Sequence, residues 1–211
     1  MSIDNIAITV IIICLICSVI IIADLFRHPQ HMKIMNIVWP VTALYSGPIG
    51  LWCYFSIGRS KEKKPFWESV LTGTLHCGGG CTLGDLLAAN MLMLFPLVFF
   101  GSKLLTEWTA EYVAAFIIGI IFQYYAIKPM KDLSAGEAIG AALKADALSL
   151  TFWQIGMYGW MAISNFLIFH RVLEASEPAF WLMMQIGMIL GFFTAFPVNW
   201  WLIKKGIKEA M

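Results

Sequence analysis

The sequence predicts an all-α, polytopic membrane helix bundle that forms one multi-pass transmembrane domain over residues 1–211. Composition is the first observation behind this prediction: 60% of the 211 residues are hydrophobic and 13% are charged, a balance that soluble domains do not show. The second is a series of about six apolar runs, each close to the length of about 20 residues that a helix needs to cross a bilayer. The third is the gathering of basic residues in the short segments between these runs. The lipid bilayer is therefore the first expected partner.

Charge and cysteine usage argue against other classes of protein. The formal net charge of +1 leaves no basic footprint for nucleic acid, so we expect no nucleic-acid partner. The five cysteines do not form the framework of a secreted disulfide-rich domain. The first apolar run lacks a basic region before it and a small-residue cleavage site, so we expect a retained helix rather than a signal peptide.

The first two transmembrane helices are expected over residues 6–25 and 34–57. Ile and Val dominate the first, and its Cys14 and Cys17 are interpreted as small buried hydrophobic residues. In the second, Pro40 and the Ser-Gly-Pro sequence at 46–48 indicate a kink, whose freed backbone groups neighbouring helices must satisfy.

The third apolar segment, residues 67–101, is the one around which we expect the others to pack. Two geometries fit it: a long tilted helix, or a broken helix whose first half enters the bilayer part-way. The glycine triplet at 78–80 makes the broken form possible, because glycine interrupts helices at little cost and broken membrane helices often surround ion sites, so both geometries stay open.

An amphipathic stretch over residues 134–146 is expected to lie at the membrane interface before the fifth helix. Ser134 and Glu137 have the spacing of a capping box, which predicts a helix beginning there. The remaining transmembrane helices are expected over residues 112–127, 147–169 and 179–203.

The distribution of basic residues predicts the orientation. With six crossings and a cytoplasmic N-terminus, most Lys and Arg residues fall on the cytoplasmic side, as the positive-inside rule requires. These residues are Arg59, Lys61, Lys63, Lys64, Lys128, Lys131, Lys144, Lys204, Lys205 and Lys208. We therefore expect both termini in the cytoplasm.

A group of residues that are costly in a bilayer marks the candidate site on the third helix. Cys77, Cys81 and Asp85 follow one another at i,i+4 spacing, and His76 stands beside them. Asp146, at the mouth of the fifth helix, lies on the same predicted side of the membrane. Thiolate and imidazole suit Cu(I) or Zn(II), and a carboxylate completes such a shell. The sequence thus predicts these five residues as metal ligands, with copper or zinc as the bound ion.

Three functions remain open on this reading. The first is metal handling or transport. The second is a membrane redox enzyme, in which Cys77 and Cys81 alternate between dithiol and disulfide. The third is a non-catalytic structural subunit, whose small residues form a packing seam and whose partner is a second copy or another membrane protein.

Four segments carry a resemblance to a known family: HCGGGCTLGD at 76–85, KAD at 144–146, IGM at 155–157 and PVNWWLIKKGIKEAM at 197–211. They resemble the bacterial domain-of-unknown-function 4396 family of integral membrane proteins. The resemblance implies a membrane helix bundle in the bacterial cytoplasmic (inner) membrane and supports the choice of the third-helix residues. It implies no particular reaction.

Overall fold

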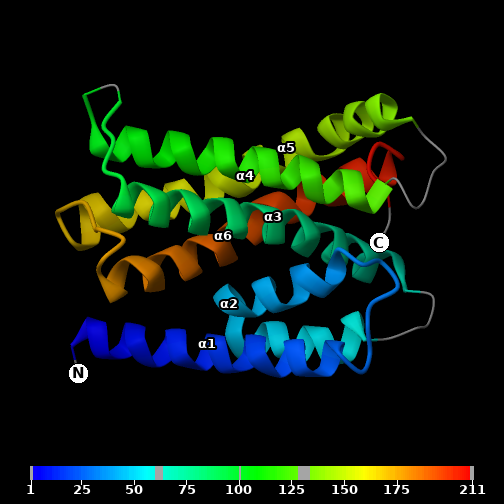
Figure 1. Ribbon diagram of the computed structural model, residues 1–211, viewed down its shortest axis with the longest axis horizontal. Helices are drawn as coiled ribbons and strands as arrows, with labels where there is room; N and C mark the ends of the chain where they lie inside the picture. Colours follow the sequence, from blue (N-terminus) through cyan, green and yellow to red (C-terminus); the bar gives the residue numbers. More distant parts are fainter. Residues whose placement is uncertain (1, 60–63, 100, 128–133, 210–211) are drawn as a thin grey trace.

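The computed structural model describes residues 2–59, 64–99, 101–127 and 134–209, which contain α-helices, two short π-helical turns and loops. The helices are α1 (Ile3–Leu25), α2 (Met35–Cys53) with its π-helical end η1 (Tyr54–Gly58), α3 (Phe66–Leu94), α4 (Lys103–Ile127), α5 (Ala135–Ile163) with its π-helical end η2 (Ser164–Ile168), and α6 (Pro178–Lys204). They lie roughly along one long axis, so that loops gather at the two ends (Figure 1). The all-α prediction is confirmed.

Four of these helices, α1, α3, α4 and α6, are long and apolar enough to cross a membrane. Large hydrophobic side chains cover their outer faces, among them Ile16, Val19 and Ile117, which are more than half exposed. In water such a surface would be an aggregation hazard, but in a bilayer it faces lipid. The prediction of a membrane protein is confirmed at this level.

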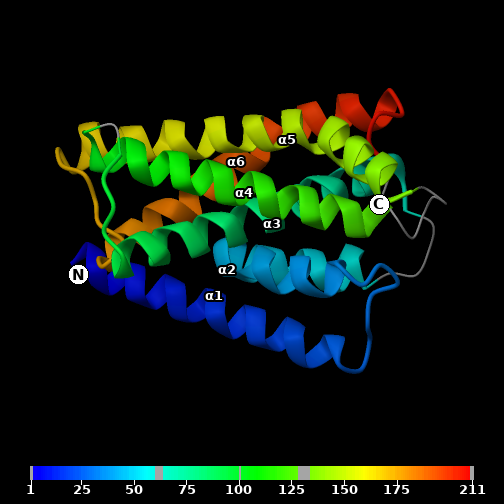
Figure 2. The same ribbon diagram turned by 45° about the horizontal axis from the view of Figure 1, so that its top comes forward.

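The second helix does not cross the bundle. Gly47 has φ +53°, a left-handed conformation, and at this residue α2 reverses its direction. The two limbs then run side by side. The ring of Trp39 packs edge-on against Tyr54 at 5.7 Å, and a Cβ placed on Gly58 would lie 2.5 Å from the Trp39 ring. Figures 1 and 2 both show α2 entering the bundle and returning to the same end. The kink predicted at residues 46–48 is therefore confirmed at Gly47, but the single crossing helix expected over residues 34–57 is not found, because α2 and η1 form a re-entrant helical hairpin.

The hairpin changes the count of crossings. The chain runs along the bundle five times, through α1, α3, α4, α5 and α6, and its two termini lie at opposite ends (Figures 1 and 2). We call these ends the N-terminal end and the C-terminal end. Six crossings are thus not confirmed in the described residues, and the predicted cytoplasmic position of both termini stays a prediction.

The third helix is continuous from Phe66 to Leu94, so of the two expected geometries the long helix is confirmed and the broken helix is not found. The residues at 78–80 serve close packing instead, each against a different neighbour. A Cβ on the first would lie 2.2 Å from the Trp153 ring of α5, one on the second 3.3 Å from Val38 of α2, and one on the third 3.0 Å from the Cα of Gly119 of α4. Three helices thus approach α3 at one level because three successive residues lack side chains.

The capping box predicted at the start of the fifth helix is present. The Ser134 hydroxyl accepts from the backbone N–H of Glu137, whose carboxylate in turn accepts from the Ser134 backbone N–H at 3.0 Å. The helix that begins there continues without interruption to Ile163. The expected interfacial helix is therefore not separate but is the first part of α5. The fourth helix also begins earlier than expected, at Lys103, where the Ser102 hydroxyl accepts from the Leu105 N–H.

Candidate functional site in the core of the bundle

All five predicted ligands are fully buried in the bundle, but they do not form one centre. His76, Cys77, Cys81, Asp85 and Asp146 each have an exposed fraction of 0%. Within the described part of the chain, no group of three or more His, Cys, Asp or Glu residues lies close enough together to hold a metal ion. The five are instead spread along the core between α3, α4 and α5, with an acidic group at each end of the row. No copper or zinc shell is therefore assembled by the described residues.

One acidic group lies toward the N-terminal end, and we call Asp85, Gln154 and Glu111 the Asp85 cluster. Oδ1 of Asp85 accepts from Nε2 of Gln154 at 3.1 Å, while Oδ2 of Asp85 and Oε1 of Gln154 have no hydrogen-bond partner. Glu111 of α4 is 3% exposed and its carboxyl group interacts electrostatically with Asp85. No ion pair among the described residues involves either carboxyl group. Two acids without a base need a proton or a cation to be stable here.

The other acidic group lies toward the C-terminal end, and we call Asp146, Lys208, His76 and Gln123 the Asp146 cluster. Nζ of Lys208 donates to Oδ1 of Asp146 at 2.9 Å, and both side chains are 0% exposed. Oδ2 of Asp146 and both amide atoms of Gln123 have no hydrogen-bond partner, and the His76 ring is approached only by the backbone carbonyl of Phe122. The His76 ring packs beside Phe122, next to Gln123 in α4, at 6.0 Å. Polar atoms this deeply buried are usually satisfied by protein, water or an ion.

Lys208 stays charged in this setting. Burial by itself lowers the pKa of a lysine, but the carboxylate of Asp146 and the nearby thiols of Cys77 and Cys81 raise it, and the net result is a pKa above the ordinary lysine value. The Asp146 cluster therefore holds a carboxylate and an ammonium in direct contact.

The two thiols of α3 lie between the clusters. Cys77 and Cys81 are free, stand one helical turn apart and interact with each other. Tyr45, from the tip of the re-entrant hairpin, belongs to the same buried core as both cysteines, and its ring packs edge-on against Trp153 of α5 at 5.9 Å. Cys77 follows His76 in α3, and Cys81 stands one turn before Asp85, so the two thiols lie between the clusters.

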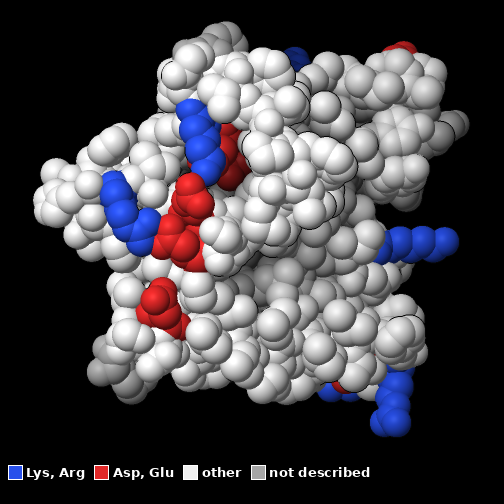
Figure 3. Space-filling model, turned by 60° about the vertical axis from the view of Figure 1, so that its left-hand side comes forward, with Lys and Arg blue, Asp and Glu red and all other residues white. Residues whose placement is uncertain are grey.

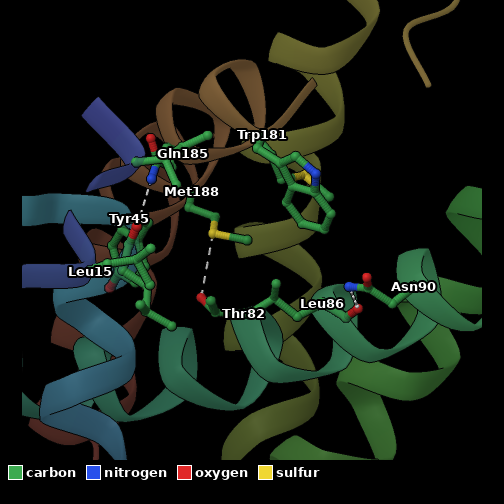
Figure 4. Close-up of a pocket in the computed structure, with 11 residues that line it drawn as sticks. Leu15, Tyr45, Thr82, Leu86, Asn90, Trp181, Gln185 and Met188 are labelled. Carbon is green, nitrogen blue, oxygen red and sulfur yellow. Dashed lines mark hydrogen bonds between the residues drawn. The ribbon is translucent and has the colours of Figure 1, made fainter. Parts of the chain in front are cut away.

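A cavity of about 280 Å³ opens between α1, α2, α3 and α6 (Figure 4). The tip of the re-entrant hairpin forms part of its wall. Its lining residues are Ile11, Leu15, Leu44, Tyr45, Thr82, Leu86, Asn90, Trp181, Met184, Gln185 and Met188. The Gln185 amide donates to the Leu44 carbonyl at 2.7 Å, which satisfies a backbone group of the tip. The Thr82 hydroxyl donates to the Met188 sulfur at 3.5 Å. The cavity is thus mainly apolar with a few convergent polar groups, the usual make-up of a small-ligand site.

Sequence reasoning missed several residues of this core. Glu111 could have been found from the sequence, because it directly precedes the apolar run at 112–127 and an acid at that place is costly unless it faces the protein interior. Gln123, in the same run, carried the weaker signal of a neutral amide. Nothing in the sequence indicated that Lys208 is buried, since a lysine in a basic tail is normally exposed to solvent. Tyr45 could be placed only after the chain reversal at Gly47 was known.

Comparison with known proteins gives a family but no function. No curated protein and no solved structure matched this chain. A family model described as a domain of unknown function (DUF4396) matches residues 66–208. The match begins at the first residue of α3 and ends at Lys208, so it includes α3–α6 and both acidic clusters, whereas α1 and α2 precede it. Since the match covers more than half of the chain, this protein belongs to the DUF4396 family.

Proposed function

We propose that this protein transports a small cation across the membrane. The observation that carries the proposal is the re-entrant hairpin, whose tip ends inside the bundle at the wall of a cavity. A Cβ on Gly47 would lie 3.1 Å from the sulfur of Cys14, which is near the middle of α1, so the tip reaches mid-depth. Backbone that breaks regular helix at this depth is tolerated where protein buries it or where it lines an aqueous path, and such hairpins are common in channels and transporters.

The charge of the core favours a cation as the transported species. The Asp85 cluster presents two carboxyl groups to the interior and no described base is paired with them. A proton is the simplest species that such a pair takes up, and a metal cation is the next. We infer a route from the cavity past Tyr45 and Cys81 to the two acidic clusters.

The distribution of basic residues indicates how the protein is oriented in the membrane. Eight of those described lie at or near the C-terminal end: Arg27, Lys33, Arg59, Lys64, Lys144, Lys204, Lys205 and Lys208. At the N-terminal end, Lys103 and Arg171 are each paired with an acid, Glu174 and Glu177 respectively. Figure 3 shows basic and acidic side chains gathered together on that side, with uncharged surface around them. By the positive-inside rule the C-terminal end faces the cytoplasm, which we take to be that of a bacterium, and the N-terminus lies outside.

The test is ion flux through purified protein in liposomes. We expect a proton or metal-ion gradient to collapse faster than in empty liposomes, as read by an internal pH-sensitive or metal-sensitive dye. Asp85→Asn should slow the flux by about tenfold or more, because it removes a charge that the route needs. Glu177→Gln is the matched control, since it removes an acid at the surface. Flux equal to that of empty liposomes for every ion tried would favour the structural-subunit alternative.

A soft metal ion as cargo is the second candidate, which keeps copper and zinc as proposed ions. The supporting observation is that two thioethers, Met184 and Met188, line the cavity, while the thiols of Cys77 and Cys81 lie in the core behind it. Thioether and thiolate are ligands that Cu(I) prefers. In the same liposomes, Cys77→Ser/Cys81→Ser should abolish Cu(I) or Zn(II) flux and leave proton flux intact. Equal metal flux in the variant and the wild type would remove the soft-metal candidate.

The redox alternative is less well supported by the geometry. Thiol–disulfide exchange needs a partner thiol to reach one of the sulfurs. Cys77 and Cys81 are both 0% exposed and lie deep between α2, α3 and α5. A protein partner therefore has no approach to them in this conformation.

A further inference from the structure

The C-terminal tail turns back into the bundle instead of running into solvent. After α6 ends at Lys204, Gly206 adopts φ +68°, and the N–H groups of Ile207 and Lys208 both donate to the carbonyl of Leu202, at 3.0 and 3.3 Å. This turn directs the Lys208 side chain inward to Asp146 of α5. A lysine is rarely buried without a strong reason, because its ammonium loses its hydration.

The surroundings of the Lys208 ammonium contain more hydrogen-bonding atoms than the ammonium contacts. Lys208 satisfies Oδ1 of Asp146 only. Oδ2 of the same carboxylate and the amide of Gln123 remain without a partner, and the His76 ring, whose one N–H faces the Phe122 carbonyl, keeps its second nitrogen free to accept. Gly119, one turn before Gln123, brings α4 close to the carboxylate, since a Cβ there would lie 3.2 Å from Oδ2. Three helices therefore surround a polar centre in which several acceptors are unused.

We propose that Asp146, His76 and Gln123 form a binding site for a small monovalent cation, and that Lys208 is its tethered occupant, which must leave before a free cation can bind. The inference rests on the proposed transport function, where this site is the cytoplasmic exit. The charge balance sets the class of ligand: one carboxylate faces one ammonium, so a replacement of charge +1 keeps the buried site neutral. The tail is then the cytoplasmic gate of the route.

The native cysteines supply a readout that does not depend on transport. Lys208 is buried against Asp146 at the C-terminal end of the core, and Gly73, one turn before Cys77, packs against Ile203 near the end of α6. We therefore expect withdrawal of the tail to open a path to the buried thiols of Cys77 and Cys81 from that end. In a background in which the other three cysteines, Cys14, Cys17 and Cys53, are changed to alanine, a membrane-impermeant maleimide is added to inside-out vesicles. Mass spectrometry then measures the rate of labelling at the two remaining thiols.

We expect Lys208→Gln to raise the labelling rate by about tenfold or more, because the local opening that exposes the thiols becomes easier. Lys208→Arg keeps the cation and should stay protected. Lys205→Gln is the matched control, because Lys205 is exposed in the same tail and should change nothing. Thermal unfolding of each purified variant identifies any that fail to fold. Unchanged labelling in a folded Lys208→Gln variant would overturn the proposal.

A second arm tests the site itself. In Lys208→Gln, sodium, potassium or ammonium chloride should slow the labelling again as the cation fills the place of the ammonium, while choline chloride at the same ionic strength should not. If none of the three cations protects the thiols, Lys208 is a structural ion-pair partner and no cation site exists. Protection in this assay together with an absence of flux in liposomes would refute the transport function and leave the cation site standing.

Discussion

At the scale of single residues, missing side chains and unpaired polar atoms define the core. Gly78 gives the clearest case, since the indole of Trp153 occupies the space that its side chain would fill. Gly84, also in α3, packs in the same way against α4, where its Cβ would lie 2.3 Å from the backbone of Ala115. Small residues let α3, α4 and α5 meet at backbone distance, and the buried carboxyl groups of the two clusters lie between these closely packed helices.

Gly78→Ala should therefore destabilise the fold. The added methyl meets a rigid aromatic ring at 2.2 Å, and such overpacking costs about 1–3 kcal/mol. Gly140→Ala is the control, because nothing lies within 4 Å of its Cβ position and alanine favours helix by up to about 1 kcal/mol. Thermal unfolding in detergent measures both changes. Equal melting temperatures for the two variants would contradict the close contact with Trp153.

The ion pair of Lys208 predicts a flat pH response near neutrality. Its pKa in the folded protein is raised above the value of about 10.4 in an unfolded chain, so its stabilising effect is complete below that value and is lost only as the pH rises through the raised pKa. The difference in melting temperature between wild type and Lys208→Gln should thus stay constant from about pH 7 to about pH 9. A difference that shrinks within this range would mean that the lysine, or a group facing it (Asp146, His76, Cys77 or Cys81), titrates there.

At the scale of elements, the re-entrant hairpin is the feature that separates this fold from a plain bundle of crossing helices. Its tip contacts α1 at Cys14, α5 at Trp153 and α6 at Gln185. Its open end is held by Tyr54, whose hydroxyl donates to Asp24 of α1 at 2.7 Å. The hairpin is therefore fixed at both ends, as a segment that positions a cavity wall must be.

The turn of the hairpin depends on glycine. Gly47→Ala places a side chain in the left-handed region and sets its Cβ 3.1 Å from the Cys14 sulfur, so we expect a loss of about 1–3 kcal/mol. Gly159→Ala serves as the control, since its position in α5 is open. If the hairpin forms the route, Gly47→Ala should also reduce flux in liposomes more than Gly159→Ala does. Wild-type stability in Gly47→Ala would show that this turn carries no strain.

At the scale of the whole molecule, the termini lie at opposite ends of the bundle (Figure 1). Most of the described basic residues lie at the C-terminal end, while Lys103 and Arg171 at the N-terminal end are each paired with an acid. The proposed topology of five passes and one re-entrant hairpin explains both observations. The described basic residues favour this arrangement, because Arg27 and Lys33, which six crossings would place outside, now lie with the other basic residues.

Cysteine accessibility in whole cells tests this topology. In a cysteine-free background, Ser2→Cys and Ser102→Cys should react with an impermeant maleimide added outside, while Gln30→Cys and Lys205→Cys should react only after the membrane is permeabilised. These positions lie at the two ends of the bundle, and the proposed topology puts those ends on opposite sides of the membrane. Outside labelling of Gln30→Cys would restore the six-crossing arrangement.

The sequence alone predicted that this is an all-α membrane protein and which helix lies at its centre. Hydrophobic runs determine that the chain enters a bilayer, and the cost of polar groups there singles out His76, Cys77, Cys81 and Asp85 as interior residues. The capping box at Ser134 could also be predicted from the sequence, because it depends only on residues that are close along the chain.

Only the tertiary structure decided what those interior residues face. Whether a glycine breaks a helix or lets another helix pack closely depends on which segments surround it in the fold. The glycines at 78–80 allow close packing. The reversal at Gly47 likewise required α1, α5 and α6 to bury its tip. Lys208 reached Asp146 from 62 positions away along the chain, and no local pattern encodes such a contact. The physical reason is common to all three: hydrophobicity and capping act locally, whereas close packing and buried charge pairing are properties of segments brought together by the fold.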